Sequence, residues 1–303
     1  MENLLTMTQF NEEEIMEILN YAEYLKRHGI RELPGKYLVS NLFFEPSTRT
    51  KLSFEIAERK LGLEIIQFDP GHSSTTKGET LFDTVKTLEA LGVNAVVIRH
   101  PEKDYYKQLE GIRIPVFNGG DGTGQHPSQS LLDLFTIKEE FGSFRGLNIV
   151  IAGDLSHSRV AASNAEALRK LGANVSFVCP PEWSGDYDAL PEWDQIIGKA
   201  DVVMLLRVQH ERHDEKMSYS KEEYHARYGL TEERAAKLKE DAIIMHPAPI
   251  NWGVEIAESL MHHAKLRVYE AVENGVYIRA AAMEMILRGG NVHAQAAPKY
   301  LAI

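Results

Sequence analysis

Apolar residues recur along the chain with two periods, one typical of helices and the other of strands. Over residues 12–26 they fall at helical spacing, which predicts an amphipathic helix. Residues 37–44 form an almost continuous apolar run, typical of a buried strand. Residues 47–61 return to the helical period, and Gly62 is expected to end that helix. We expect three of its side chains to point inward: Leu52, Ile56 and Leu61.

The same alternation continues and predicts an α/β fold. A first series has further strands at residues 64–68, 95–98 and 115–117, with helices at 80–91 and 128–141. A second series has strands at 148–152, 174–178, 202–206 and 242–245, with helices at 159–171, 231–238 and 275–287. Strands that alternate with helices form parallel sheets covered on both faces. We therefore expect two doubly wound parallel-sheet domains, divided near residue 134.

Composition limits what such a protein can be. Of 303 residues, 44% are hydrophobic and 25% are charged, which is typical of globular proteins. No apolar run reaches about 18 residues, and the start of the chain lacks a signal-peptide layout. We therefore expect a soluble protein without a membrane span. The single cysteine, Cys179, excludes an intramolecular disulfide and a cysteine-cluster metal site, and it fits a cytoplasmic protein.

The chain is acidic, yet one segment is suited to binding an anion. A formal net charge of −11 argues against nucleic acid as a partner. In residues 41–50 (Asn-Leu-Phe-Phe-Glu-Pro-Ser-Thr-Arg-Thr) a buried strand ends and a hydroxyl-rich helix start follows. The N–H groups of a first helical turn, together with the helix dipole, bind phosphate. Ser47 could instead be a simple N-cap, but Arg49 opposes the dipole unless an anion lies between them.

Several segments resemble the aspartate and ornithine carbamoyltransferase family, and they span nearly the whole chain. Residues 43–55 are similar to the carbamoyl-phosphate signature of that family. The other similar segments follow in the family's order: Gly120-Asp121-Gly122, Gln125-His126-Pro127-Ser128-Gln129, Leu206-Arg207-Val208-Gln209 and His246-Pro247-Ala248-Pro249. The resemblance implies two α/β domains linked by interdomain helices. Residues 1–133, completed by a C-terminal helix at about 276–303, would bind carbamoyl phosphate, and residues 134–275 would bind aspartate.

The resemblance also implies which residues hold carbamoyl phosphate. Thr50, Arg99 and His126 would contact the carbonyl, where preorganised donors stabilise the negative charge that develops. Gln129 would contact the amide nitrogen. Further contacts would come from Ser47, Thr48, Arg49, Ser73, Lys77, Ala248 and Pro249, and the catalytic set would be Arg49, Thr50, Lys77, Arg99 and His126. Taken alone, Arg99 could form a strand-end salt bridge and His126 could simply neighbour a helix N-cap.

The polar stretch at residues 69–77 is expected to be a loop, and by itself it would be a solvated one. In the family that the chain resembles, the residues matching Ser73 and Lys77 reach into the site of a neighbouring subunit. The resemblance therefore implies a homotrimer with shared active sites. Regulatory chains and higher assembly are left open by the sequence.

The second substrate is expected to be dicarboxylic. Arg159 lies between a predicted strand and a helix, and Arg207 and Gln209 alternate at a strand end so that their side chains share one face. Each arginine can engage a carboxylate bidentately, and the matching residues of the family bind aspartate. Ornithine-type enzymes carry His-Cys-Leu-Pro where this chain has His-Pro-Ala-Pro at 246–249, which also favours aspartate.

Two charged residues are expected to act between the domains. Glu45 and Arg212 resemble residues that form interdomain ion pairs in the closed state of the family. Arg212 could instead belong to a surface charge cluster, because it lies in a second polar stretch, residues 210–221, that is expected to be a loop.

The implied reaction transfers the carbamoyl group of carbamoyl phosphate to L-aspartate, an early step of pyrimidine biosynthesis, without metal or cofactor. No Gly-x-Gly-x-x-Gly follows Gly153, which disfavours a dinucleotide fold. The paired histidines at 210/213 and 262/263 lack further metal ligands at suitable spacing. An ornithine-type or other carbamoyltransferase, and a non-catalytic carbamoyl-phosphate-binding paralogue, stay open as alternatives.

Trp252 departs from the aspartate-type pattern, which commonly has arginine at this place in Pro-x-Asn-Arg-Gly-Val-Glu. The loss of a cation and its fork could weaken aspartate binding. The indole ring could instead stack on the same neighbours, and the sequence does not choose between these interpretations.

Trp252→Arg is expected to leave carbamoyl-phosphate binding unchanged and to lower the aspartate concentration that gives half-maximal rate. The reason is that the restored guanidinium would add a cation beside the substrate loop. Initial rates over an aspartate titration measure this. An unchanged or weaker response to aspartate would remove the idea.

Overall fold

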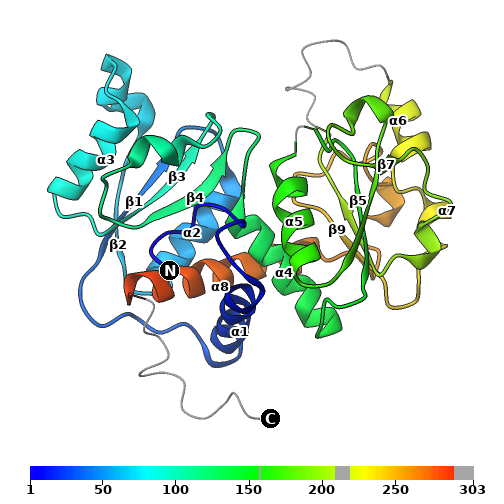
Figure 1. The fold of residues 1–303 in the computed structure, drawn as a ribbon, viewed down its shortest axis with the longest axis horizontal. Helices are drawn as coiled ribbons and strands as arrows, with labels where there is room; N and C mark the ends of the chain where they lie inside the picture. The colour runs from blue at the N-terminus through cyan, green and yellow to red at the C-terminus, as the bar shows by residue number, and fades with distance from the viewer. Residues whose placement is uncertain (157, 209–218, 290–303) are drawn as a thin grey trace. The chain divides into compact units, whose positions relative to one another are not determined.

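The chain folds into two compact units, which are described separately. A computed structural model describes residues 1–156, 158–208 and 219–289. Unit 1 comprises Met1–Phe135 with Val272–Ile303, and unit 2 comprises Thr136–Ala271 (Figure 1). Each contains a parallel sheet with helices, so the predicted class of two parallel-sheet α/β domains is confirmed. Among the described residues, no helix has the length and apolar character needed to cross a membrane.

The sheet of unit 1 has the strand order β2-β1-β3-β4, with parallel pairing throughout. Its strands are β1 (Leu38–Phe43), β2 (Glu64–Ile66), β3 (Ala95–His100) and β4 (Val116–Asp121). Its helices are α1 (Glu12–His28), α2 (Thr48–Lys60) and α3 (Leu81–Ala90). The division between the units falls inside α4 (Pro127–Phe141) and α8 (Val268–Leu287). Short 3-10 helices are η1 (Pro70–His72), η2 (Ser74–Lys77) and η3 (Tyr105–Leu109).

Helix α1 has capping residues at both of its ends. Asn11 accepts a hydrogen bond from the Glu14 N–H, and the Glu14 side chain accepts from the Asn11 N–H, a complete capping box. Acidic residues fill the first turn and basic residues the last, which complements the helix dipole. Gly29 ends the helix at a positive φ of 86°.

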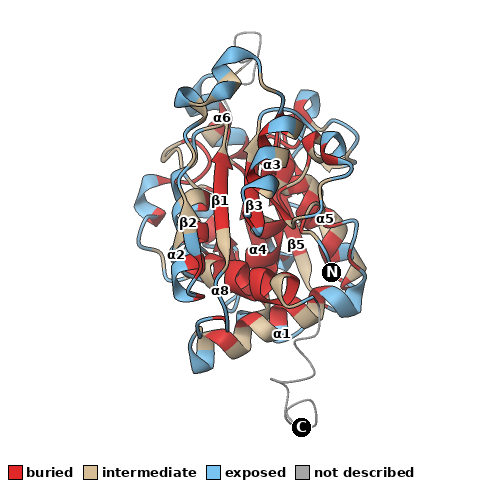
Figure 2. Ribbon diagram, turned by 90° about the vertical axis from the view of Figure 1, so that its left-hand side faces the viewer, coloured by how far each residue is buried: buried red, intermediate tan, exposed pale blue. Residues whose placement is uncertain are grey.

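Different helices cover the two faces of this sheet. Alternate side chains of a strand point to opposite faces. Leu42, Val96 and Ile98 share one face and pack in an apolar cluster with residues of α3 and η3. On the opposite face Asn41 of β1 donates to Glu58 of α2 (2.8 Å), so α2 lies there. Figure 2 shows β1 and β3 buried over most of their length.

The expected orientation of α2 is wrong for two of its three apolar residues. Leu61 is buried, but Leu52 and Ile56 are 50% and 44% exposed. The buried face instead carries Thr50, Ser53, Phe54, Ala57 and Glu58. The apolar pattern predicted the wrong buried face because polar side chains of α2 are buried with hydrogen-bond partners. Ser53 donates to the Thr50 carbonyl, and Glu58 accepts from Asn41.

The sheet of unit 2 has the strand order β7-β6-β5-β8-β9, again with parallel pairing. Its strands are β5 (Asn148–Ala152), β6 (Asn174–Val178), β7 (Ala189–Leu190), β8 (Val202–Leu205) and β9 (Ile243–Met245). The helices are α5 (Arg159–Lys170), α6 (Lys221–Tyr228) and α7 (Glu232–Ala235), with 3-10 helices η4 (Pro181–Trp183), η5 (Ile197–Lys199) and η7 (Glu258–Leu260).

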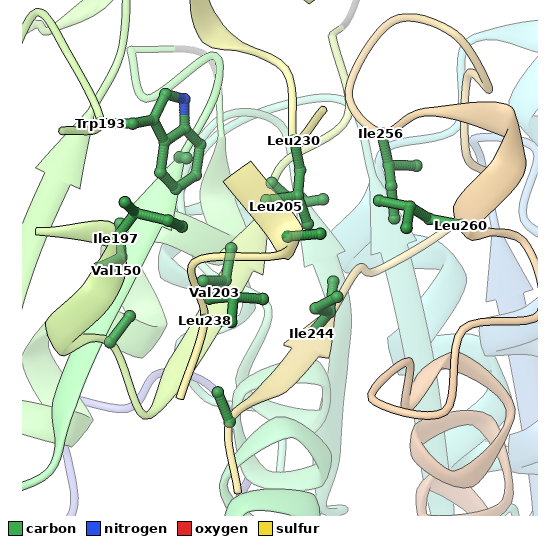
Figure 3. Packing of buried hydrophobic residues seen from close by; sticks show 14 of the residues in the cluster. Val150, Trp193, Ile197, Val203, Leu205, Leu230, Leu238, Ile244, Ile256 and Leu260 are labelled. Atoms are coloured by element: carbon green, nitrogen blue, oxygen red, sulfur yellow. The ribbon is translucent and has the colours of Figure 1, made fainter. Parts of the chain in front are cut away.

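One face of this sheet forms an apolar core, the unit 2 cluster (Figure 3). Val150, Val203, Leu205 and Ile244 come from the strands. They pack against residues from the connecting segments, among them Trp193, Ile197, Leu230, Leu238, Ile256 and Leu260.

Four elements of the described part of the chain differ from the sequence prediction. The short strand β7 and the helix α6 were not predicted, and α7 is a single turn. Helix α6 is mostly polar, and its buried residues are Tyr224 and Tyr228, which leaves no apolar stripe to detect. Helix α8 begins at Val268, whereas the prediction began it at 275. The earlier turns expose Tyr269 and Val272, so they lack a clear apolar face in the sequence.

Glu58 predicts a pH-dependent contribution to the stability of unit 1. Burial raises the pKa of its carboxyl from 4.5 to about 7, while the Asn41 hydrogen bond acts in the opposite direction. A carboxyl whose pKa is raised by folding stabilises the protein fully below its unfolded pKa, and this contribution is lost as pH rises through the folded pKa. At 1.36 kcal/mol per pKa unit, the loss between pH 5 and 8 should be about 3 kcal/mol. Glu58→Gln should abolish it.

Thermal unfolding between pH 4.5 and 8.5 measures this effect. The melting temperature of the wild type should fall relative to that of Glu58→Gln as pH rises. Glu64→Gln, at an exposed glutamate of β2, is the matched control and should follow the wild type. Parallel pH profiles for the wild type and Glu58→Gln would contradict the prediction.

Candidate active site

The strand ends of unit 1 bring several predicted site residues to one edge of its sheet. Because β1, β3 and β4 are parallel, their carboxyl ends lie at the same edge. Residues 45–50 follow β1, Arg99 lies near the end of β3 opposite Phe43 of β1, and His126 follows β4. Open α/β sheets bind their ligands at such an edge.

The start of α2 is suited to an anion. Ser47 occupies the N-cap position, yet within the described residues its side chain makes no capping hydrogen bond, so the simple N-cap alternative does not hold. Thr48 and Arg49 are exposed, whereas Thr50 is buried. The first turn carries no acidic residue that would occupy its N–H groups. Its N–H groups, its dipole and the Arg49 cation therefore all favour a bound phosphate.

Thr50 and His126 meet from segments far apart in the sequence. Thr50 Oγ1 lies 3.5 Å from His126 Nε2, and both side chains are buried. His126 directly precedes α4, and its carbonyl accepts from the N–H groups of Gln129 and Ser130 (both 3.0 Å). This contact joins the start of α2 to the start of α4.

Asp121 shapes the loop that carries His126. The Asp121 side chain is completely buried and accepts from the Asp104 N–H (2.9 Å) and from the Gln125 N–H. Burial raises the pKa of Asp121 above its usual value, and these hydrogen bonds act in the opposite direction. Gln125 also accepts from the Met7 N–H (3.2 Å). The sequence marked Asp121 as part of a family motif, but only these contacts show that it anchors the loop.

The partners of Arg99 include a backbone carbonyl and a carboxylate. Its Nη1 donates to the Gly119 carbonyl (3.1 Å), and its Nε lies 3.3 Å from Glu45 Oε2. The strand-end ion pair considered as an alternative is therefore present, and it orients the guanidinium. Glu45 was expected to take part in an interdomain ion pair, and so was Arg212, which lies outside the described residues.

The stretch before α3 is folded by its own hydrogen bonds. The predicted loop at residues 69–77 contains the 3-10 helices η1 and η2. Ser73 Oγ donates to the Pro70 carbonyl (3.0 Å) and lies 2.7 Å from Thr75 Oγ1. Lys77 is exposed at the end of η2, and Gly78 follows in the left-handed conformation.

In unit 2 the ends of β5 and β8 approach each other closely. Gly153, directly after β5, has a φ of 131°, and a Cβ there would lie 2.9 Å from the Cβ of Leu206. The Leu206 N–H donates to the Ala152 carbonyl (2.7 Å). Only glycine allows this approach, which fixes the segment after β5 beside the segment that carries Arg207.

Arg159 and Arg207 follow these two strands. Arg159 is the first residue of α5 and is 7% exposed, and Ser158 caps the helix by accepting from the Ala161 N–H (3.2 Å). Arg207 follows β8 and is partly exposed. A buried cation at a helix start opposes the dipole, so Arg159, like Arg49, is suited to a bound anion.

Some residues named from the sequence lie outside the described part of the chain: His157, Gln209, His210, Arg212 and His213. Among the described residues, no group of three or more His, Cys, Asp or Glu side chains is placed to hold a metal ion.

Glu255 ties together the loops that follow β8 and β9. Its buried carboxylate accepts from the Val208 N–H (2.8 Å), the Asn251 N–H (2.6 Å) and Asn251 Nδ2 (2.6 Å). His246 Nε2 lies 3.7 Å from the same carboxylate, and His246 Nδ1 accepts from the Ala248 N–H (2.8 Å). The neighbours of Arg207 and the segment 246–249 are thereby held in one arrangement, a role that sequence reasoning missed.

Trp252 lies in the same loop and packs against the unit 2 cluster of Figure 3. It forms an isolated bridge with Ile256, a member of that cluster. Pro249 is exposed at the other end of the loop, while Ala248 is partly buried. The contact of the indole with the core supports the interpretation in which its ring supplies packing.

Two parallel-sheet α/β units, with arginines at helix starts and strand ends, are suited to a transferase that acts on anionic substrates. Residues 2–139 match the family model described as "Aspartate/ornithine carbamoyltransferase, carbamoyl-P binding domain". Residues 145–286 match the model described as "Aspartate/ornithine carbamoyltransferase, Asp/Orn binding domain". The chain belongs to the aspartate/ornithine carbamoyltransferase family.

Individual relatives agree. The chain is 53% identical over 291 residues to an aspartate carbamoyltransferase catalytic subunit of Fusobacterium nucleatum, covering 95% of this chain and 96% of that protein. It is 52% identical over 299 residues to the one of Listeria monocytogenes, covering 97% and 99%. A Trypanosoma cruzi aspartate transcarbamoylase structure with carbamoyl aspartate and phosphate has a TM-score of 0.85, at 28% identity over 93% of this chain and 94% of that one. The M. jannaschii catalytic subunit has a TM-score of 0.84, at 31% identity over 96% and 100%.

Glu255→Gln should destabilise unit 2 and raise the KM for the amino-acid substrate. Val208 N–H and Asn251 Nδ2 donate to one carboxylate oxygen and Asn251 N–H donates to the other, so either orientation of an amide would turn its NH2 toward a donor. An unsatisfied buried donor costs about 1–3 kcal/mol. Urea unfolding and substrate titrations measure the two effects.

Glu258→Gln is the control, because Glu258 is exposed in the same segment. It should leave both the urea midpoint and KM unchanged. A Glu255→Gln variant that unfolds at the wild-type urea concentration would show that the carboxylate does not hold the loops.

Proposed function

We propose that the chain transfers the carbamoyl group of carbamoyl phosphate to the α-amine of L-aspartate, forming N-carbamoyl-L-aspartate and phosphate. The observation that carries the proposal is the contact of Thr50 Oγ1 with His126 Nε2 at 3.5 Å, beside the anion-binding start of α2. It gives unit 1 a phosphate-binding helix terminus next to donors suited to a carbonyl. The names of the relatives support aspartate as the acceptor.

Unit 1 binds carbamoyl phosphate in this proposal. The phosphate contacts the first turn of α2 through Ser47, Thr48, Arg49 and Thr50. Thr50, Arg99 and His126 polarise the carbonyl oxygen, and preorganised donors of this kind are worth most when charge develops in the transition state. Gln129 contacts the amide nitrogen.

Unit 2 binds aspartate in this proposal. Arg159 and Arg207 each offer a planar fork to one carboxylate. Gln209, which lies outside the described residues, is included in the aspartate contacts on the family resemblance alone. Two cations would repel the side chain of ornithine, which favours the dicarboxylic acceptor. Structures of Trypanosoma cruzi aspartate transcarbamoylase include complexes with aspartate and phosphate and with N-(phosphonacetyl)-L-aspartic acid, which agrees with such an acceptor.

The proposed chemistry needs no metal or cofactor. The amine nitrogen of aspartate attacks the carbonyl carbon, and the C–N bond forms as negative charge develops on the carbonyl oxygen. The C–O bond to phosphate then breaks, and the departing phosphate takes the proton lost by the amine. Catalysis is mainly positioning and charge stabilisation.

The proposal includes a homotrimer whose active sites are shared. Ser73 and Lys77 would act in the site of a neighbouring subunit, and Lys77 is exposed in the single chain. The exposed pair Leu52 and Ile56 on α2 supplies an apolar surface that a neighbour could cover. Glu45 and Arg212 keep the role that the family resemblance implies, in ion pairs of the closed state. We place the enzyme in the cytoplasm and in pyrimidine biosynthesis, which the single cysteine and the names of the relatives support.

Formation of carbamoyl aspartate and of citrulline, measured side by side with aspartate and with ornithine, tests the function. Aspartate should be the active acceptor. Activity with ornithine alone would establish the ornithine-type alternative, and inactivity with both would favour a binding paralogue.

Arg99→Ala should lower turnover by a factor of about 10² or more, because it removes a donor to the developing oxyanion. Arg113→Ala is the matched control, since Arg113 is an exposed arginine that contacts Glu89. Circular dichroism should show both variants folded. Near-normal turnover of Arg99→Ala would refute the role assigned to it.

A further inference from the structure

Unit 1 contains a buried arginine to which the proposed chemistry gives no role. Arg279 of α8 is 2% exposed. Its guanidinium carbon lies 4.9 Å from the centre of the Phe54 ring, and its Nη2 donates to Ser128 Oγ (3.3 Å). Burial lowers the pKa of Arg279 to about 9, while the negative charge of Asp133 acts in the opposite direction. Burial therefore makes the charged form of Arg279 less stable than it would be in water.

A second residue makes room for this cation. Gly275 lies one turn earlier on α8, and a Cβ there would be 2.4 Å from Nη1 of Arg279. Among the described residues, Nε of Arg279 has no hydrogen-bond partner. A well-packed apolar side chain often stabilises a fold more than a buried ion does. Packing alone does not account for an arginine at this position.

The contacts of Arg279 lead to both helix starts of the unit 1 site. Phe54 lies on α2 four residues after Thr50, so the two side chains share one face of the helix. Ser128 lies on α4 two residues after His126. Asp133, one turn further along α4, accepts from Gln129 Nε2 (3.1 Å). The guanidinium of Arg279 thus contacts both α2, which starts at the proposed phosphate site, and α4, which starts beside His126.

We propose that Arg279 is a positioning residue for carbamoyl phosphate, which sets the start of α2 against the start of α4 and orients Gln129 through Asp133. The inference rests on the proposed function of unit 1. Arg279 acts on α2 through its contact with the Phe54 ring and on α4 through its hydrogen bond to Ser128. It acts on Asp133 through its charge. Asp133 then holds the Gln129 amide in the rotamer that meets the substrate.

Arg279→Met separates positioning from folding, because methionine fills the space without the charge or the donors. We expect the KM for carbamoyl phosphate to rise about tenfold or more, with a melting temperature equal to that of the wild type or higher. The KM for aspartate at saturating carbamoyl phosphate should change less than twofold. Arg279→Lys should restore part of the loss, since it returns the cation but not the planar fork.

Met283→Ala is the control, because Met283 is buried on the same helix and its truncation destabilises by cavity formation. It should lower the melting temperature and leave both KM values near wild type. If Arg279→Met leaves the KM for carbamoyl phosphate unchanged, or if Met283→Ala raises it equally, the positioning role is overturned.

A double-mutant cycle tests the route through Asp133. Asp133→Asn and Arg279→Met should each raise the KM for carbamoyl phosphate, and the double variant should be no worse than the worse single one. Effects that multiply would overturn the coupling between the two residues.

Calorimetric binding of inorganic phosphate keeps the inference separate from the proposed function. If the wild type forms no carbamoyl aspartate but binds phosphate more tightly than Arg279→Met, the function fails and the positioning role stands. A wild type that neither turns over nor binds phosphate would overturn both.

Discussion

Because β1, β3 and β4 pair in parallel, they all end at the same edge of the unit 1 sheet, and the segments that follow them begin there. This constraint brings residues 45–50, Arg99 and His126 within reach of one another although they are far apart in the sequence. It also directs the start of α2 to that edge. The 3.5 Å contact of Thr50 with His126 is a consequence of this topology. Unit 2 repeats the arrangement with Arg159 and Arg207.

Irregular segments at these edges are held by buried polar groups. Asp121 gathers backbone N–H groups of its own loop and of the neighbouring one, and Glu255 does the same after β8 and β9. A buried carboxylate is costly unless several donors satisfy it, so each one is compatible with only a narrow set of loop conformations. Specific geometry is obtained in this way without regular secondary structure. Arg279 joins two helices in a similar way, because it contacts the Phe54 ring of α2 and donates to the Ser128 hydroxyl of α4.

The charges suited to binding anions are local features of an otherwise acidic chain. The chain carries a net charge of −11, so the global field does not attract anionic substrates. In the proposed function this attraction comes from Arg49 and Arg159, which stand at helix starts where a cation opposes the dipole. An anion bound between such a cation and the helix start would interact favourably with both.

By itself the sequence determined the fold class, most of the strands and long helices, and the segments that line both sheet edges. It could do so because helix and strand periods and helix-start chemistry are local properties. Only the tertiary structure decided which face of α2 is buried, since Glu58 is satisfied by Asn41 of another element. The anchoring by Asp121 and Glu255, the partner of Glu45 and the burial of Arg279 were likewise invisible in the sequence. Each depends on donors or rings that lie far away along the chain and become neighbours only when the sheets form.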